Sequence, residues 1–389
     1  MKTPKAWKSY DEQLEILKKR GLQIGDEKKA LSYLRMIGYY RLSGYLYPFR
    51  QFNPENPQNR LDSFIPNSSF EDVKKLYMFD KRLRQLALDA LERIEIALRV
   101  NIAYTLGQHH SLAHRYDRYF DSSFNHEEWL ERYDNLVNRE KDTGFVKHHL
   151  QHYSDLPVWV ACEVWDFGTM SMLYKGMKEE DKNRIAKFYR LKDGRHLQTH
   201  LHAFNIIRNV SAHHSRLWNR DVVIKASLKG LSDTEWKKLP VGRSFVYFCL
   251  MKRMLDIICP TSKWGERFLS LLADFPSVEN KAISLEQMGM TIDPEHWRLW
   301  RRVDGQKKAP SLVSPTTSGW QSMGELLVPI IPQSPIKANF LHLSSNITKY
   351  RLQAKQVFQT AFLTVRSSET PSPVSDDLTP SPKPDKSNQ

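Results

Sequence analysis

The sequence has 389 residues, of which 40% are hydrophobic and 11% aromatic, and it carries a formal net charge of +14. The apolar share is that of an ordinary globular protein, whereas the excess of basic residues is not ordinary. Such an excess attracts polyanions and favours a nucleic-acid partner; the alternative is that Lys and Arg only solvate the surface. Three cysteines without a CxxC pair exclude a disulfide framework and a cysteine-based zinc site.

The sequence lacks the segments that direct a chain into or across a membrane. Its first residues are charged but hold no apolar stretch of the roughly 7 to 15 residues that a signal peptide needs. No later stretch approaches the ~18 apolar residues of a membrane span. We therefore expect a cytoplasmic protein with no membrane partner.

The N-terminal residues are expected to form a helical and aromatic extension. Residues 11–20 combine spaced apolar side chains with charges and precede Gly21, which predicts a short amphipathic helix. Residues 31–50 crowd tyrosines and glycines together with three arginines. This composition indicates close backbone packing, and the alternative is a surface that stacks bases and holds phosphates. The proline-containing residues 51–60 predict a loop.

A long helix is predicted from Ser68 onward. Ser68 and Glu71 have the spacing of a capping box, and apolar residues then recur three or four positions apart. Opposite charges four residues apart predict that most charges of this helix are solvated or paired locally. These pairs are Asp80/Arg84, Asp89/Arg93 and Glu95/Arg99.

Residues 109–155 are polar and only weakly periodic. We expect surface loops here around one helix near residues 127–139. The region is rich in histidine, but no carboxylate or cysteine spacing supports a metal site, so a polar loop is the better interpretation. The histidines concerned are His109, His110, His148, His149 and His152.

Helices account for the periodic segments of the remaining chain. An apolar run follows Pro157, an amphipathic segment covers residues 180–189, and a further helix is predicted through residues 197–207. Residues 232–274 again have a helical pattern. No stretch has the alternating strands of an all-β protein or the strand and helix alternation of a parallel sheet, so we predict an all-α fold.

These patterns divide the chain into four parts. Residues 1–67 are the N-terminal extension, residues 68–230 the helical core, and residues 231–304 C-terminal helices that pack on the core. Residues 305–389 are rich in Pro, Ser and Thr, and we expect them to be a low-complexity and mostly disordered tail.

The segment IIRNVSAHHSRLWNR, residues 206–220, combines a phosphate-binding arginine, a proton-carrying histidine and an amide. Histidine, with an unperturbed pKa of ~6.5, can accept the proton of a ribose 2′-hydroxyl or donate one to the leaving 5′-oxygen, while arginine stabilises charge on phosphorus. On a helix, Asn209 and His213 share one face, so the amide could orient the imidazole, and Arg208 has the reach to join them.

Spacing alone is weak evidence, because Arg195 and His200 form a second Arg-x4-His pair. The form RNVSAH at Arg208, Asn209 and His213 is similar to the Arg-x4-6-His motif of the HEPN superfamily. The wider sequence resembles the Abi family related to AbiD and AbiF. The resemblance lies in five segments in the expected order over about residues 10–220, with a weaker echo, MGMTIDPEHWRLW, at residues 288–300. The five are DEQLEILKKRGLQI, IGYYRLSGYLYPFR, FEDVKKLYMFDKRLRQLALDALERIEIALR, PVWVACEVWDFGTMSMLY and RNVSAHHSRLWNR.

The resemblance implies a HEPN-type helical bundle and a metal-independent endoribonuclease that acts as an abortive-infection toxin against phage. It places the catalytic motif at Arg208, Asn209 and His213, and it implies neither metal nor cofactor. Family members are expected to form homodimers in which two motifs face each other across one site. A small structured RNA is expected to restrain some of them. The family says nothing about the tail after residue 304.

Further residues are candidates for the same site. His214, Arg216 and Arg220 follow the motif and are candidate RNA-binding residues; the alternative is that they are surface charges beyond a helix end. Glu163 and Glu92 are candidates to pair with Arg208 inside the bundle and orient it. For each glutamate, an ordinary structural salt bridge is the alternative role.

Two other functions compete with the ribonuclease hypothesis. A non-catalytic RNA-binding module would use the basic surface and residues 31–50 to sequester RNA, and His213→Ala would leave its toxicity unchanged. A sensor or scaffold directed at proteins would show no RNA-dependent effect, and the net charge would then have no use.

Overall fold

The computed structural model describes residues 5–56 and 58–301. These residues are mostly helical, as predicted, and contain one small sheet. The N-terminal elements are α1 (Tyr10–Lys19), α2 (Glu27–Ile37), α3 (Tyr39–Leu46), β1 (Arg50–Phe52), β2 (Arg60–Phe64) and α4 (Phe70–Gly107). The remaining elements are α5 (His126–Glu140), α6 (Gly144–His152), α7 (Val158–Ala161), α8 (Phe167–Gly176), α9 (Glu179–Phe188), α10 (Gly194–Ala212), α11 (Ser244–Ile258) and α12 (Trp264–Ala273).

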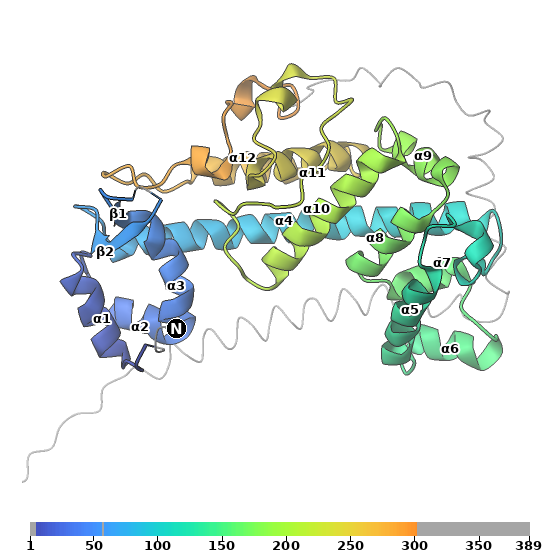
Figure 1. The fold of residues 1–389 in the computed structure, drawn as a ribbon, viewed down its shortest axis with the longest axis horizontal. Coiled ribbons are helices and arrows are strands. Elements are labelled where there is room, and N and C mark those ends of the chain that lie inside the picture. Colours follow the sequence, from blue (N-terminus) through green and yellow to red (C-terminus); the bar gives the residue numbers. More distant parts are fainter. Residues whose placement is uncertain (1–4, 57, 302–389) are drawn as a thin grey trace, which may run out of the picture. The chain divides into compact units, whose positions relative to one another are not determined.

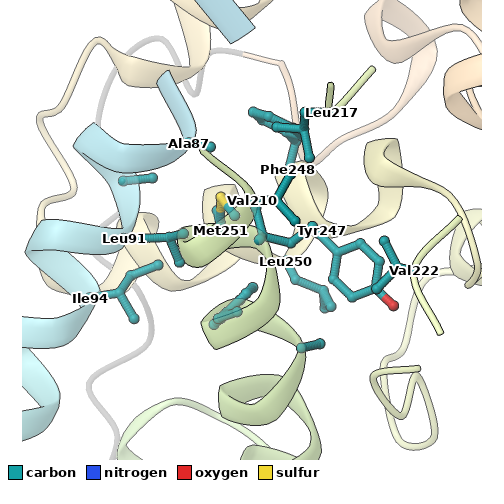
Figure 2. Packing of buried hydrophobic residues seen from close by; sticks show 14 of the residues in the cluster. Ala87, Leu91, Ile94, Val210, Leu217, Val222, Tyr247, Phe248, Leu250 and Met251 are labelled. Atoms are coloured by element: carbon teal, nitrogen blue, oxygen red, sulfur yellow. The ribbon is translucent and has the colours of Figure 1, made fainter. Parts of the chain in front are cut away.

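Helix α4 is the element against which most of the others pack. It contacts α3 near its start and α7 near its end, and α10, α11 and α12 lie along it (Figure 1). Its long apolar face explains this position, because a helix of 38 residues offers many turns of buried side chains. Figure 2 shows the middle of this core, where side chains of α4, α10 and α11 interdigitate; among them are Ala87, Leu91, Ile94, Val210, Phe248 and Met251.

The predicted helices agree with the structure apart from small shifts at their ends. The expected helix at residues 11–20 is α1, the one at 127–139 is α5, and the one at 180–189 is α9. The cap of α4 lies one residue later than predicted: the Ser69 side chain, not that of Ser68, accepts the N–H of Asp72. Both serines precede the apolar pattern, which does not distinguish between them.

Two local predictions need correction. The predicted loop at residues 51–60 connects the strands of a β-hairpin that was not predicted, and the two ends of that range belong to β1 and β2. In the hairpin, Arg50 pairs with Phe64 and Phe52 with Arg60. The Arg60 guanidinium lies 3.6 Å from the centre of the Phe52 ring and stabilises this irregular pairing. Residues 144–152 form helix α6 rather than a loop, and its weak periodicity reflects that only Val146 is buried.

The division of the chain is only partly visible in the structure. Residues 5–301 lie within one compact unit, and α11 and α12 share a core with the helices of residues 68–230. The predicted disorder of residues 305–389 falls outside the described residues. Among the described residues, no helix is long and apolar enough to cross a membrane.

The buried His114 makes the stability of this core sensitive to acid. Its side chain packs against the rings of Trp129 and Tyr133, and neither ring nitrogen has a hydrogen-bond partner among the described residues. Burial, together with the nearby Arg115, lowers the pKa of His114 to about 3. The folded state therefore favours the neutral imidazole, whose stabilising contribution is present above pH ~6.5 and is lost as the pH falls towards 3.

Replacing His114 by Phe is expected to remove this pH dependence while retaining a ring that fills the same space. Linkage predicts that the wild type loses about 2 kcal/mol more unfolding free energy than His114→Phe between pH 7.5 and pH 5. Urea unfolding at the two pH values measures the difference. Equal losses in both proteins would show that His114 is not held neutral.

Candidate functional site

The Arg208–His213 motif lies at the C-terminal end of α10. Asn209 is in the last turn and Arg208 directly precedes it, and His213 caps the helix, with its backbone N–H donating to the Asn209 carbonyl oxygen at 2.9 Å. The His213 side chain is exposed, whereas Arg208 and Asn209 are half-buried. The helix end thus exposes the imidazole to solvent, while the guanidinium five residues earlier is partly desolvated.

The helix ends in a Schellman motif that fixes the chain just after His213. The N–H of His214 donates to the Ser211 carbonyl at 3.1 Å, and the N–H of Ser215 donates to the Val210 carbonyl at 2.9 Å. This turn requires a left-handed residue, and His214 takes that place with a φ of 58°. A left-handed residue other than glycine is strained, so surrounding contacts must hold it.

Asn209 contacts the arginine of the motif. The Asn209 side-chain oxygen accepts a hydrogen bond from Arg208 Nη1 at 3.3 Å. The helical spacing suggests that this amide orients the imidazole of His213. In the structure it orients the guanidinium, while the backbone of the same residue bonds to His213.

The acidic neighbour of Arg208 is Glu95, a residue that the sequence pattern assigns to a local pair on α4. Glu95 forms the expected ion pair with Arg99 at 2.5 Å. Burial raises the pKa of Glu95, and the charges of Arg99 and then Arg208 oppose that rise. A carboxylate four residues before an arginine is ordinary on a helix, so nothing in the sequence indicated this electrostatic interaction with Arg208 on α10.

The two glutamates expected to orient Arg208 do not pair with it. Glu92 and Glu163 have exposed side chains rather than lying inside the bundle, and among the ion pairs of residues 5–56 and 58–301 neither joins Arg208. The carbonyl oxygen of Glu163 instead accepts from Arg99 at 3.4 Å. Arg99 therefore connects the Glu95 carboxylate to the chain that precedes α8.

A buried carboxylate holds the segment after the motif. Asp80, on α4, accepts the backbone N–H groups of Trp218 at 2.7 Å and Leu217 at 3.1 Å, and the hydroxyl of Tyr45 at 2.6 Å. Its fourth partner is Arg84. The predicted local pair is present, but it is buried rather than solvated. Burial raises the pKa of Asp80 against the opposing effect of Arg84 and the other donors.

Helix α3 contacts the same segment from the other side. Arg216 donates to the Gly44 carbonyl oxygen, and Arg41 donates to the His214 carbonyl oxygen at 3.3 Å. Burial lowers the pKa of Arg216, whose guanidinium is thus engaged within the protein. Of the three candidate RNA-binding residues, His214 and Arg220 are exposed and Arg216 is half-buried.

The second Arg-x4-His pair is not assembled into a site. The Arg195 side chain is exposed, while His200 is buried and its Nε2 lies 2.7 Å from the carbonyl oxygen of Ser227. Burial lowers the pKa of His200 to about 4. His200 is therefore a neutral core histidine, unlike the exposed His213.

No described part of the chain gathers three His, Cys, Asp or Glu side chains in a way that could hold a metal ion. Within the histidine-rich region, His148 and His152 lie one turn apart on α6, with ring centres 4.5 Å apart. The Nδ1 atom of His152 is engaged with the His148 carbonyl oxygen at 2.7 Å.

Residues 32–219 match the family described as Abi-like protein. Through this segment the chain belongs to the Abi-like family. Family membership supports a role in abortive infection, a form of defence. The matched residues begin in α2 and end just after the N–H groups that Asp80 accepts, so they include the whole motif. No curated protein and no solved structure matches the chain.

In this Abi-like protein, Asp80→Ala is expected to lower the unfolding free energy by about 3–5 kcal/mol. The substitution leaves the buried Arg84 without its counter-charge and removes the acceptor of two backbone N–H groups. Asp89→Ala on the same helix is the control: Asp89 pairs with Arg93 and with Arg267 on α12, but all three side chains are partly exposed, so the change should cost only about 1 kcal/mol. Chemical denaturation of both variants tests the difference, and similar losses would contradict the role assigned to Asp80.

Proposed function

We propose that this Abi-like protein is a metal-independent endoribonuclease of the HEPN type that acts as a toxin in abortive infection. The observation that carries the proposal is the arrangement at the end of α10: an exposed His213 five residues after a half-buried Arg208. Histidine supplies proton transfer near neutral pH and arginine supplies a fixed positive charge, which together suffice for cleavage at a ribose 2′-hydroxyl. The formal net charge of +14 suits a polyanionic substrate.

In the proposed reaction the RNA supplies its own nucleophile. The neutral imidazole of His213 accepts the proton of a ribose 2′-hydroxyl, and the 2′-oxygen attacks the adjacent phosphorus. The bond from phosphorus to the 5′-oxygen breaks, and that oxygen takes up a proton from the imidazolium form of His213. The products are a 2′,3′-cyclic phosphate and a 5′-hydroxyl end. Arg208 stabilises the charge that develops on the phosphoryl oxygens.

Glu95 and Asn209 are assigned to positioning Arg208. The Asn209 side chain directs the guanidinium through its hydrogen bond, and the charge of Glu95 holds it at the surface of the bundle. A phosphate that enters the site meets a guanidinium whose direction is already set. Less side-chain conformational entropy is therefore lost on binding.

His213→Ala is expected to reduce RNA cleavage by about 100-fold or more, the usual range for losing a general acid or base. His202→Ala is the matched control, because His202 is also exposed on α10 and lies outside the motif. Purified full-length proteins are incubated with total bacterial RNA in EDTA, and the fragment ends are sequenced.

Cleavage by the wild type and His202→Ala but not by His213→Ala supports the proposal. Equal cleavage by all three proteins assigns the activity to other residues or to a contaminant. RNA that is bound but left intact by the wild type favours the non-catalytic RNA-binding module.

We also propose that the active form is a homodimer formed through α4. Ile96, Val100 and Tyr104 recur every fourth residue on this helix and are each about half exposed, which leaves an apolar stripe on its surface. Antiparallel pairing of two copies about Val100 sets Ile96 of one opposite Tyr104 of the other.

The charges at the ends of this stripe are complementary in the same pairing. Glu92, one turn before the stripe, faces the partner's Gln108, one turn after it. The Gln108 side-chain oxygen accepts from Arg184 at 2.7 Å, so a guanidinium lies near that end. Glu95 and Arg99 border the stripe, and the pairing thus brings the two Arg208 neighbourhoods to one interface.

Val100→Glu is expected to convert the dimer to a monomer of 45.7 kDa, because it places two carboxylates at the centre of an apolar contact. Val223→Glu is the control, since Val223 is also exposed and lies away from α4. Light scattering after size exclusion gives the masses. A wild type that is monomeric at micromolar concentration, or a Val100→Glu variant that remains dimeric, would refute this interface.

A further inference from the structure

The most exposed aromatic side chain next to the motif is Tyr40 on α3. Its side chain is 92% exposed. The following residue, Arg41, donates to the His214 carbonyl oxygen. Gly44, four residues after Tyr40, accepts from Arg216. Residues four apart lie on one face of a helix, so Tyr40 stands at the edge of the face of α3 that holds the motif segment.

A second tyrosine continues the same row. Tyr47 is 43% exposed and lies seven residues, or about 10 Å along a helix axis, from Tyr40. Gly44, three residues before Tyr47, accepts from Arg216, and Tyr47 is close enough to Arg216 to affect its pKa, so Tyr47 lies near the segment after His214. The two tyrosines therefore flank the point at which α3 meets this segment.

The charges around these rings are cationic. Arg220 acts on the pKa of Arg216 as a like charge, so the two guanidinium groups are neighbours. The Arg60 guanidinium lies 5.9 Å from the centre of the Tyr47 ring. Arg41 and Arg220 are exposed and add accessible positive charge near the exposed rings. Positive charge beside exposed aromatic rings is the combination that tracks a nucleic-acid backbone while bases stack on the rings.

We propose that Tyr40 and Tyr47 form a base-stacking subsite for single-stranded RNA next to the scissile phosphate. The inference rests on the proposed function and adds the form of the substrate. Bases inside a duplex are stacked on one another and cannot lie on a tyrosine ring, so the subsite selects unpaired nucleotides. Binding there holds the strand beside the exposed His213 and leaves Arg208 to meet the phosphate at which the chain is cut.

The test measures binding separately from cleavage. Full-length His213→Ala protein, which retains the tyrosines, is titrated into a fluorescein-labelled single-stranded RNA 12-mer of mixed sequence, and the anisotropy is recorded. Adding Tyr40→Ala is expected to raise Kd about tenfold, whereas Tyr40→Trp should keep it within about twofold because a larger ring still stacks.

Tyr153→Ala is the matched control, since Tyr153 is 60% exposed and follows α6, away from the motif. It should leave Kd unchanged. A duplex of the same 12-mer should bind equally to the Tyr40→Ala variant and to its parent, because stacking does not contribute there. Circular dichroism confirms that each variant is folded.

The outcomes separate this proposal from the proposed ribonuclease. A loss specific to Tyr40→Ala and to single strands supports the subsite even if the wild type cuts no RNA. Equal binding by Tyr40→Ala and its parent, an equal loss on the duplex, or no detectable RNA binding by any variant overturns the subsite, even if the wild type cleaves RNA. In the last case the exposed tyrosines belong to a surface for another class of partner.

Discussion

The buried carboxylate of Asp80 is the constraint on which the arrangement of this protein depends. It receives donors from three places in the chain: Tyr45 on α3, Arg84 on its own helix, and the backbone after α10. A charge taken out of water is tolerated only when its hydrogen bonds are satisfied and a counter-charge is near. Asp80 meets both conditions only when the N-terminal helices, α4 and the motif segment are assembled together.

The end of α10 is consequently rigid in its backbone and open in its side chains. The strained His214 is held between the Schellman hydrogen bonds on one side and Arg41 on the other. His213, one residue earlier, is exposed. A fixed backbone with an accessible imidazole combines a defined position with room for a large substrate, which is what cleavage of RNA within a strand requires.

Much of this fold was predictable because helices repeat a simple pattern. The apolar period of α4 and the order of the five family-like segments indicated the long helix and the place of the motif. The same order led to the prediction that Arg195 and His200 are not the motif, and the burial of His200 is consistent with that prediction. Helix α6 and the β1–β2 hairpin were missed because few of their side chains are buried, so their sequences lack the alternation that burial imposes.

The contacts that position the site were not predictable from spacing. Asp80/Arg84 and Glu95/Arg99 are alike in sequence, since both pairs have the separation of an ordinary surface ion pair on a helix. One is fully buried and reaches Trp218, 138 residues away, and the other is near Arg208. The burial of each pair and its distant partners depend on which helix packs against it. A local sequence pattern does not contain that information.

The distance in sequence between Asp80 and its backbone donors also sets an order on folding. Contacts between distant residues form only when the intervening loop closes, and that closure costs chain entropy. During synthesis, α3 and α4 leave the ribosome long before residues 217 and 218, so the donors of Asp80 are not yet present when its helix forms. The backbone beside His213 therefore takes its final form only when this closure occurs. Under the proposed function, a nascent chain lacks the completed site until residues 217 and 218 have been synthesised.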